Sequence, residues 1–163
     1  MRILILSVII IISSTNLFII WICLELNLFS FVPLLLNKIS TNERKASINY
    51  FLAQTLGSTI FLLSSVMLFY ASWLIKLNIT LLIFIILLKI GAVPCHYWYP
   101  LTIRMIRWIN CFILSTWQKL APIFILTYII CFNIKFSNLE IIISLNALTG
   151  GLIGIRQILL KNL

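Results

Sequence analysis

The chain has 163 residues, of which 63% are hydrophobic and 9% are charged, and its formal net charge is +9. So few polar side chains cannot cover a soluble globule of this length, which excludes a soluble globular protein. A membrane-spanning helix needs about 20 apolar residues, so we expect about six spans in an all-α integral membrane protein.

Apolar runs predict helices at about residues 2–15, 17–36, 44–70, 78–94, 109–131 and 139–157, within a single transmembrane domain over residues 1–163. The start of the chain has no small-residue cleavage site, so we interpret it as a retained helix. Ser40 and Glu43 have the spacing of a capping box, and Asn138 with Glu140 can cap the sixth helix. We therefore assign both glutamates to helix starts.

Basic residues near the helix ends indicate the orientation. With six spans, the opposite side holds Lys76 and Lys135, and the N-terminal side holds Arg2, Lys38, Arg44, Lys45, Arg104, Arg107, Arg156 and Lys161. Positive residues stay in the negative compartment, so we expect both termini to face the cytoplasm or the matrix. The charge also favours anionic lipid headgroups such as cardiolipin, and it does not require nucleic acid.

Three charged residues within predicted spans are explained neither by helix starts nor by the orientation, namely Glu25, Lys89 and Lys119. A charge at the bilayer centre costs about 3 kcal/mol on insertion scales, so such residues suggest a proton or ion pathway. Lys89 could alternatively extend its stem toward the interface, and Glu25 could be a static counter-ion. A desolvated lysine can exchange a proton near neutral pH, which makes proton transfer the favoured role.

Helix breakers lie close to both lysines. Gly91 and Pro94 follow Lys89, and Pro122 follows Lys119, so we expect a broken helix near Gly91–Pro94 and a weakened helix at Pro122. Irregular backbone is tolerated in membranes where it lines a polar cavity. Kinks also serve packing, so the pattern alone is a weak signal.

Four motifs occur in order along the chain, at residues 21–27, 49–54, 89–100 and 116–122. They read WICLELN, NYFLAQ, KIGAVPCHYWYP and TWQKLAP. These motifs resemble the subunit 2 family of mitochondrial NADH:ubiquinone oxidoreductase, respiratory complex I. The resemblance implies an antiporter-like, proton-translocating subunit of the membrane arm, located in the mitochondrial inner membrane and encoded in the mitochondrial genome. It also implies a Glu25–Lys89 pair and a central relay lysine at Lys119.

The resemblance covers only part of the family's usual length. Members are usually about twice as long, so we expect an N-terminal half or split form. Either a second polypeptide supplies the remaining helices, or this copy has lost part of its pumping function. The other expected partners are the membrane-arm subunits of complex I.

The sequence does not predict a redox centre in this chain. Cys23, Cys95, Cys111 and Cys131 form no CxxC motif, and His96 is the single histidine, so we expect no metal site and no cofactor. The resemblance implies that FMN, iron-sulfur clusters and ubiquinone are bound by other subunits. Two alternatives stay open: a structural membrane-arm subunit without its own proton path, and a fragment of a stand-alone cation/proton antiporter.

Overall fold

The structure, a computed structural model, describes residues 2–36, 41–70, 75–133 and 143–151. Every regular element among them is a helix, which confirms the all-α class. The elements are α1 (Arg2–Ser13), α2 (Leu17–Leu35), α3 (Thr41–Tyr70), α4 (Ile75–Ile90), α5 (Trp98–Met105), α6 (Trp108–Ser115) and α7 (Trp117–Asn133). A further helical stretch covers residues 143–151.

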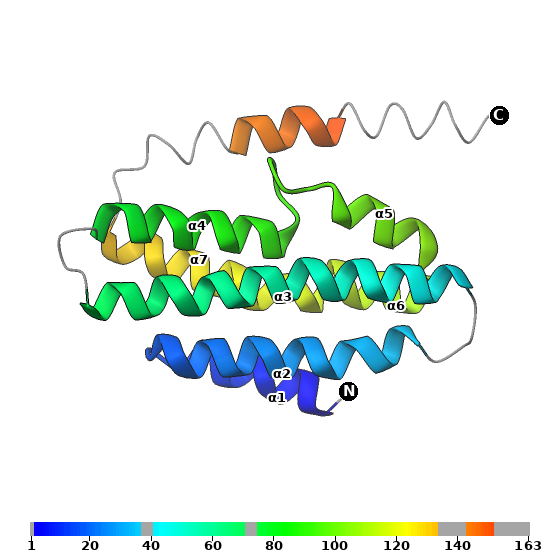
Figure 1. The fold of residues 1–163 in the computed structure, drawn as a ribbon. Coiled ribbons are helices and arrows are strands. Elements are labelled where there is room, and N and C mark those ends of the chain that lie inside the picture. Colours follow the sequence, from blue (N-terminus) through cyan, green and yellow to red (C-terminus); the bar gives the residue numbers. More distant parts are fainter. Residues whose placement is uncertain (1, 37–40, 71–74, 134–142, 152–163) are drawn as a thin grey trace.

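The long helices lie side by side and alternate in direction, so the bundle has two ends (Figure 1). One end holds the starts of α3 and α6 and the end of α5, and the other holds the start of α4 and the end of α7. α4 and α5 are separated by non-helical residues 91–97, and α6 and α7 by Thr116. Two of the long segments are therefore interrupted.

Buried apolar side chains form two core clusters, which occupy different parts of the bundle. The first cluster includes Val8, Ile20, Leu24, Phe61, Ile85, Ile86, Ala121 and Ile125. The second cluster consists of Leu4, Leu28, Phe31, Leu35, Tyr50 and Leu114. Because α1, α2 and α3 contribute to both clusters, these helices extend past the boundary between them.

Small and polar side chains form the buried face of α3, which contacts α2, α4 and α5. This face comprises Ala46, Ser47, Tyr50, Gln54, Gly57, Ser58, Phe61, Ser64 and Ser65. Helices in a membrane associate through small residues that allow close approach and through interhelical hydrogen bonds. This composition therefore suits α3 to a central position among the helices.

Large apolar side chains cover much of the outside, including Ile3, Phe29 and Leu63, which are 59%, 60% and 58% exposed. Three segments are long and apolar enough to cross a membrane: Leu17–Leu35, Thr41–Leu68 and Trp108–Ile130. Two shorter apolar helices cover Arg2–Ser13 and Leu77–Ile90. An apolar exterior of this kind is what a hydrocarbon solvent requires.

The helix bounds differ from the expected ranges at interior breaks. α4 ends at Ile90 where the apolar pattern predicted residue 94, and the range 109–131 is divided at Thr116 into α6 and α7. α5 was not predicted, and α7 continues through Pro122. Only residues 143–151 of the expected helix 139–157 are described, and Ser40, Asn138 and Glu140 lie outside the described residues.

Candidate functional site: a polar layer between two core clusters

Polar side chains from four helices gather between the two core clusters. Along α2, Asn27 lies between Leu24 of the first cluster and Leu28 of the second, and along α3, Gln54 lies between Phe61 and Tyr50 in the same way. We call the group formed by Glu25, Asn27, Gln54, Lys89, Gln118 and Lys119 the polar layer. Lys89 is 6% exposed, Asn27 4% and Gln54 9%.

Lys89 lies in the last turn of α4, and its aliphatic stem crosses Gly57 of α3. A methyl group at position 57 would lie 3.2 Å from Lys89 Cγ and 3.3 Å from Cε, so glycine makes room for the stem. Gln54 Nε2 donates a hydrogen bond to the Lys89 carbonyl oxygen at 3.3 Å. The Glu25 carboxylate acts on the Lys89 ammonium electrostatically, from beyond ion-pair distance.

A Schellman motif ends α4. Gly91 has a φ of 78°, its N–H donates to the Leu88 carbonyl at 3.1 Å, and the Ala92 N–H donates to the Leu87 carbonyl at 2.9 Å. A positive φ costs a residue with a side chain about 1–2 kcal/mol, so this ending depends on glycine. The predicted break is present, but it begins at Gly91, before Pro94 can act on the helix.

The carbonyl groups freed at the break find donors on neighbouring elements. The Trp98 indole N–H of α5 donates to the Leu88 carbonyl at 2.9 Å, in addition to the bond from Gly91. Beyond the break, Asn146 Oδ1 accepts the Val93 N–H at 2.7 Å. Because buried backbone groups without partners are costly in hydrocarbon, these side chains stabilise an interruption within the bundle.

Lys119 lies in the first turn of α7, and its Nζ atom is 4.0 Å from the centroid of the Tyr99 ring. This distance is within the range of a cation–π interaction. Tyr99 is half-buried, and it also packs against the backbone at Gly91. The interruption next to Lys119 is at Thr116, on the side away from Pro122.

A hydrogen-bonded cluster joins α2, α3 and α7 in the same layer. Asn27 Nδ2 donates to Gln118 Oε1 at 2.8 Å, and Gln118 Nε2 donates back to Asn27 Oδ1 at 3.3 Å. The Tyr50 hydroxyl donates to Gln118 Oε1 at 3.4 Å. Gln118 precedes Lys119, so this cluster fixes the turn that carries the second lysine.

The predicted site residues therefore fall into two groups. Glu25 and Lys89 interact with each other, whereas Lys119 has the aromatic ring of Tyr99 as its partner. Sequence reasoning missed the roles of Tyr99, Gly57 and Gln118 in holding the lysines. Their residue types give no signal by themselves, since each contact joins helices that lie far apart in the sequence.

An ion pair lies at the end of the bundle where α3 begins. Arg107 Nε donates to Glu43 Oε1 at 2.6 Å, and Arg107 Nη2 donates to Glu43 Oε2 at 3.2 Å. This hydrogen bond raises the pKa of the Arg107 guanidinium above its ordinary value. Glu43 is in the first turn of α3 as predicted, and it also links this turn to the start of α6.

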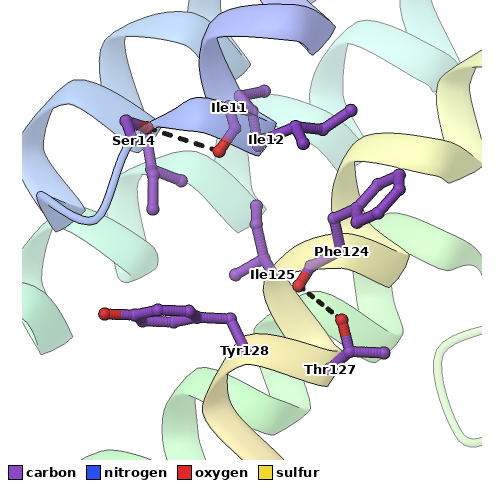
Figure 2. Close-up of a pocket in the computed structure, with 8 residues that line it drawn as sticks. Ile11, Ile12, Ser14, Phe124, Ile125, Thr127 and Tyr128 are labelled. Carbon is purple, nitrogen blue, oxygen red and sulfur yellow. Dashed lines mark hydrogen bonds between the residues drawn. The ribbon is translucent and has the colours of Figure 1, made fainter.

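No cluster of metal-ligating side chains adds to this layer among the described residues. No three side chains of histidine, cysteine, aspartate or glutamate gather there into a possible metal site. An apolar groove of about 260 Å³ lies between α1 and α7, lined by Ile11, Phe124, Ile125 and Tyr128 among others (Figure 2). The hydroxyls of Ser14 and Thr127 at this groove bond the carbonyls of their own segments.

Comparison with known proteins identifies the family. A family model described as NADH:quinone oxidoreductase/Mrp antiporter, transmembrane, matches residues 14–163. The chain belongs to this family. It is therefore an antiporter-like membrane protein, and both lysines of the polar layer lie within the matched region.

Curated relatives carry a more specific name. The chain is 40% identical to NADH-ubiquinone oxidoreductase chain 2 of Lumbricus terrestris over 100% of its own length and 49% of the relative. Identity is 37% to the protein of the same name from Anopheles gambiae, over 88% of this chain and 42% of the relative. The chain thus spans about half the length of the curated relatives that it matches.

Proposed function

We propose that the chain is a proton-translocating subunit in the membrane arm of NADH:ubiquinone oxidoreductase. The observation that carries this proposal is Lys89, which is 6% exposed at the interrupted end of α4 and interacts with Glu25. A buried lysine at a helix break serves no evident packing purpose that an apolar residue would not serve better. The family match and the relatives' name support the same function.

Each of the three charged residues has a distinct role in this proposal. Lys89 binds a proton from one side of the layer, and Glu25 stabilises the resulting ammonium. Lys119 receives and releases the proton farther along the path. Burial opposes the charged forms of lysine and glutamate. A change in the charge of one of these residues therefore alters proton binding at its neighbour. The energy of electron transfer would reach this chain through a conformational change and a change in the electric field at these residues.

The proposed location is the mitochondrial inner membrane, with the N-terminus and the basic end of the bundle on the matrix side. Arg2 begins α1, Arg44 and Lys45 lie in the first turns of α3, and Arg104 and Arg107 flank the junction of α5 and α6. The starts of α3 and α6 and the end of α5 share one end of the bundle (Figure 1). Basic residues on one side agree with the rule that positive charges stay in the negative compartment.

The proposed partners are other membrane-arm subunits and anionic lipids such as cardiolipin. The second half of the family's helices would complete the proton path, on the same polypeptide or on a separate one. FMN, iron-sulfur clusters and ubiquinone would be bound by other subunits, where NADH oxidation occurs. Mass spectrometry of the solubilised assembly tests these partners, since a chain that purifies without redox subunits would contradict them.

Replacing Lys119 tests the function directly. NADH-driven proton uptake would be measured in liposomes that contain the complex with Lys119→Met, with electron transfer recorded in parallel. We expect fewer protons per electron in this variant and no change in a matched Lys45→Met variant, because Lys45 is exposed. Equal proton uptake in Lys119→Met and in the unaltered complex would leave a structural role for the chain.

A further inference from the structure

The first two residues of α5 contact the two lysine-bearing helices separately. The Trp98 indole donates to the Leu88 carbonyl, next to Lys89 in α4. The Tyr99 ring lies under Lys119 of α7, with 4.0 Å between the Nζ atom and the ring centroid. The two rings also touch each other edge to face, with 5.8 Å between their centroids and an interplanar angle of 85°.

The end of α4 contacts Tyr99 without an intervening side chain. A Cβ atom added to Gly91 would lie 2.9 Å from Tyr99 Cβ, which is closer than real Cβ atoms approach. The Tyr99 backbone is also tied to the break, since its N–H donates to the His96 carbonyl at 3.2 Å. A movement of the α4 end must therefore shift the Tyr99 ring or be resisted by it.

We propose that Tyr99 is a positioning residue for Lys119, whose ring binds the ammonium form and couples its charge to the end of α4. The inference rests on the proposed function, because it assigns the device by which the two lysine positions communicate. An aromatic face attracts a cation and has little attraction for a neutral amine. The ring therefore attracts the Lys119 ammonium, and any displacement of the ring weakens that attraction.

The position of Lys119 makes such a partner necessary. It lies within the membrane-length apolar segment Trp108–Ile130, where a charge is costly unless it has a favourable contact. The ion pair found among the described residues joins Glu43 and Arg107, whereas Lys119 interacts with a ring. A ring carries no net charge, so it holds the ammonium without leaving a buried anion once the proton departs.

A series of fluorinated phenylalanines at position 99 tests this inference in the assembled complex in liposomes. Fluorine withdraws density from the ring face while changing its size little, so the Lys119-dependent part of proton uptake should fall stepwise with each fluorine. That part is the difference between the unaltered complex and Lys119→Met. Tyr99→Phe should retain it, and Tyr99→Leu should lower it by about 2- to 30-fold, the range of cation–π interactions.

Two controls separate positioning from structural damage. Tyr97→Leu removes a tyrosine that is 77% exposed, and it should leave proton uptake unchanged. Reductive methylation with ¹³C keeps Lys119 cationic, and its methyl signal should show an upfield ring-current shift that Tyr99→Phe preserves and Tyr99→Leu removes. This signal reports the contact even in a variant that no longer translocates protons.

The outcomes distinguish the inference from the function on which it rests. If Lys119→Met abolishes translocation but the fluorinated series is flat, the inference is overturned and the proposed function stands. The same conclusion follows if the methyl signal keeps its position in Tyr99→Leu. If Lys119→Met translocates at the full rate, the proposed function fails and the inference fails with it.

Discussion

Lys89 and Lys119 are the same residue type, but the structure holds them in opposite ways. Lys89 is in the last turn of α4, where carbonyl groups point past the helix end and favour a cation, and Glu25 adds a negative charge. Lys119 is in the first turn of α7, directly after the one-residue interruption at Thr116, and Tyr99 supplies a ring. Lys89 is also the more deeply buried.

The two lysines therefore differ in how firmly their partners are fixed in the structure. The partners of Lys89 belong to the scaffold: a helix end, a carboxylate on α2 and the contact surface at Gly57. The partner of Lys119 belongs to α5, which begins just after the interrupted backbone. In the proposed function, the ammonium of Lys119 is thus the easier of the two to destabilise by a small structural change.

We expect the largest effect at Gly91, because this residue ends the helix that carries Lys89 and contacts Tyr99, the partner of Lys119. Gly91→Val places a branched side chain at a φ of 78° and against Tyr99 Cβ. We expect a loss of about 2–5 kcal/mol in the free energy of unfolding, from the backbone conformation and overpacking together. Unfolding in mixed detergent micelles measures this change.

Gly150→Ala is the matched control, since a Cβ atom there meets nothing within 4 Å and residue 150 is helical. Alanine is the better helix former, so stability should stay the same or rise by up to about 1 kcal/mol. Equal effects at Gly91 and Gly150 would contradict the role given to the α4 ending.

Removing the Gln118 amide should affect the surroundings of Lys119 and not those of Lys89. The amide fixes the turn that carries Lys119, and the contacts of Lys89 do not include it. Gln118→Leu leaves the buried Asn27 amide without this partner, at a cost of about 1–3 kcal/mol in unfolding free energy. The double variant with Asn27→Leu should lose less than the sum of the single variants. Additive losses would show that the two amides do not interact.

Substitutions at Gly57 alter the surroundings of Lys89 and leave those of Lys119 unchanged. Gly57→Ala places a methyl group 3.2 Å from Lys89 Cγ, so the flexible stem must shift by a few tenths of an ångström. The better helix propensity of alanine, worth about 1 kcal/mol, offsets that strain. We expect little change in stability for alanine, and a larger loss for Gly57→Leu in the same unfolding assay. Equal stability in both variants would mean that the stem does not occupy this space.

The ion pair between Glu43 and Arg107 should have the smallest effect. The Arg107 side chain is 39% exposed, so salt screens the pair and Arg107→Ala should destabilise the chain only slightly. The folded-state pKa of Arg107 is raised, so its contribution is present below the unfolded pKa and is lost as the pH rises through the folded one. Stability should therefore not vary with this pair between pH 6 and 9, as a pH titration of both forms would show.

The sequence predicts the fold best where one physical signal dominates. The long apolar run of α2 was expected over residues 17–36, and the helix spans Leu17–Leu35. The end of α4 was not predictable from hydropathy, because apolar residues continue through Val93 and the positive φ of Gly91 decides the ending. α5 was missed because its eight residues mix apolar side chains with a proline and an arginine.

The candidate site, like the fold, is predictable from the sequence only in part. Glu25, Lys89 and Lys119 are conspicuous in sequence, since a charge inside an apolar run is costly. Their surroundings are not, because Tyr99 and Gly57 become neighbours of the lysines only when α5 packs near α7 and α3 against α4. The sequence therefore identifies which groups carry charge, and the structure identifies what holds each charge.

The most direct test of the account is the number of protons translocated per electron in Lys89→Met, Lys119→Met and the double variant. In the proposed function the two lysines lie in series on one path, so each single variant should lose the contribution of this chain, and the double variant should lose no more than either. Electron transfer from NADH serves as the common reference. Losses that add in the double variant would contradict a single path, and full translocation in either single variant would contradict the role of that lysine.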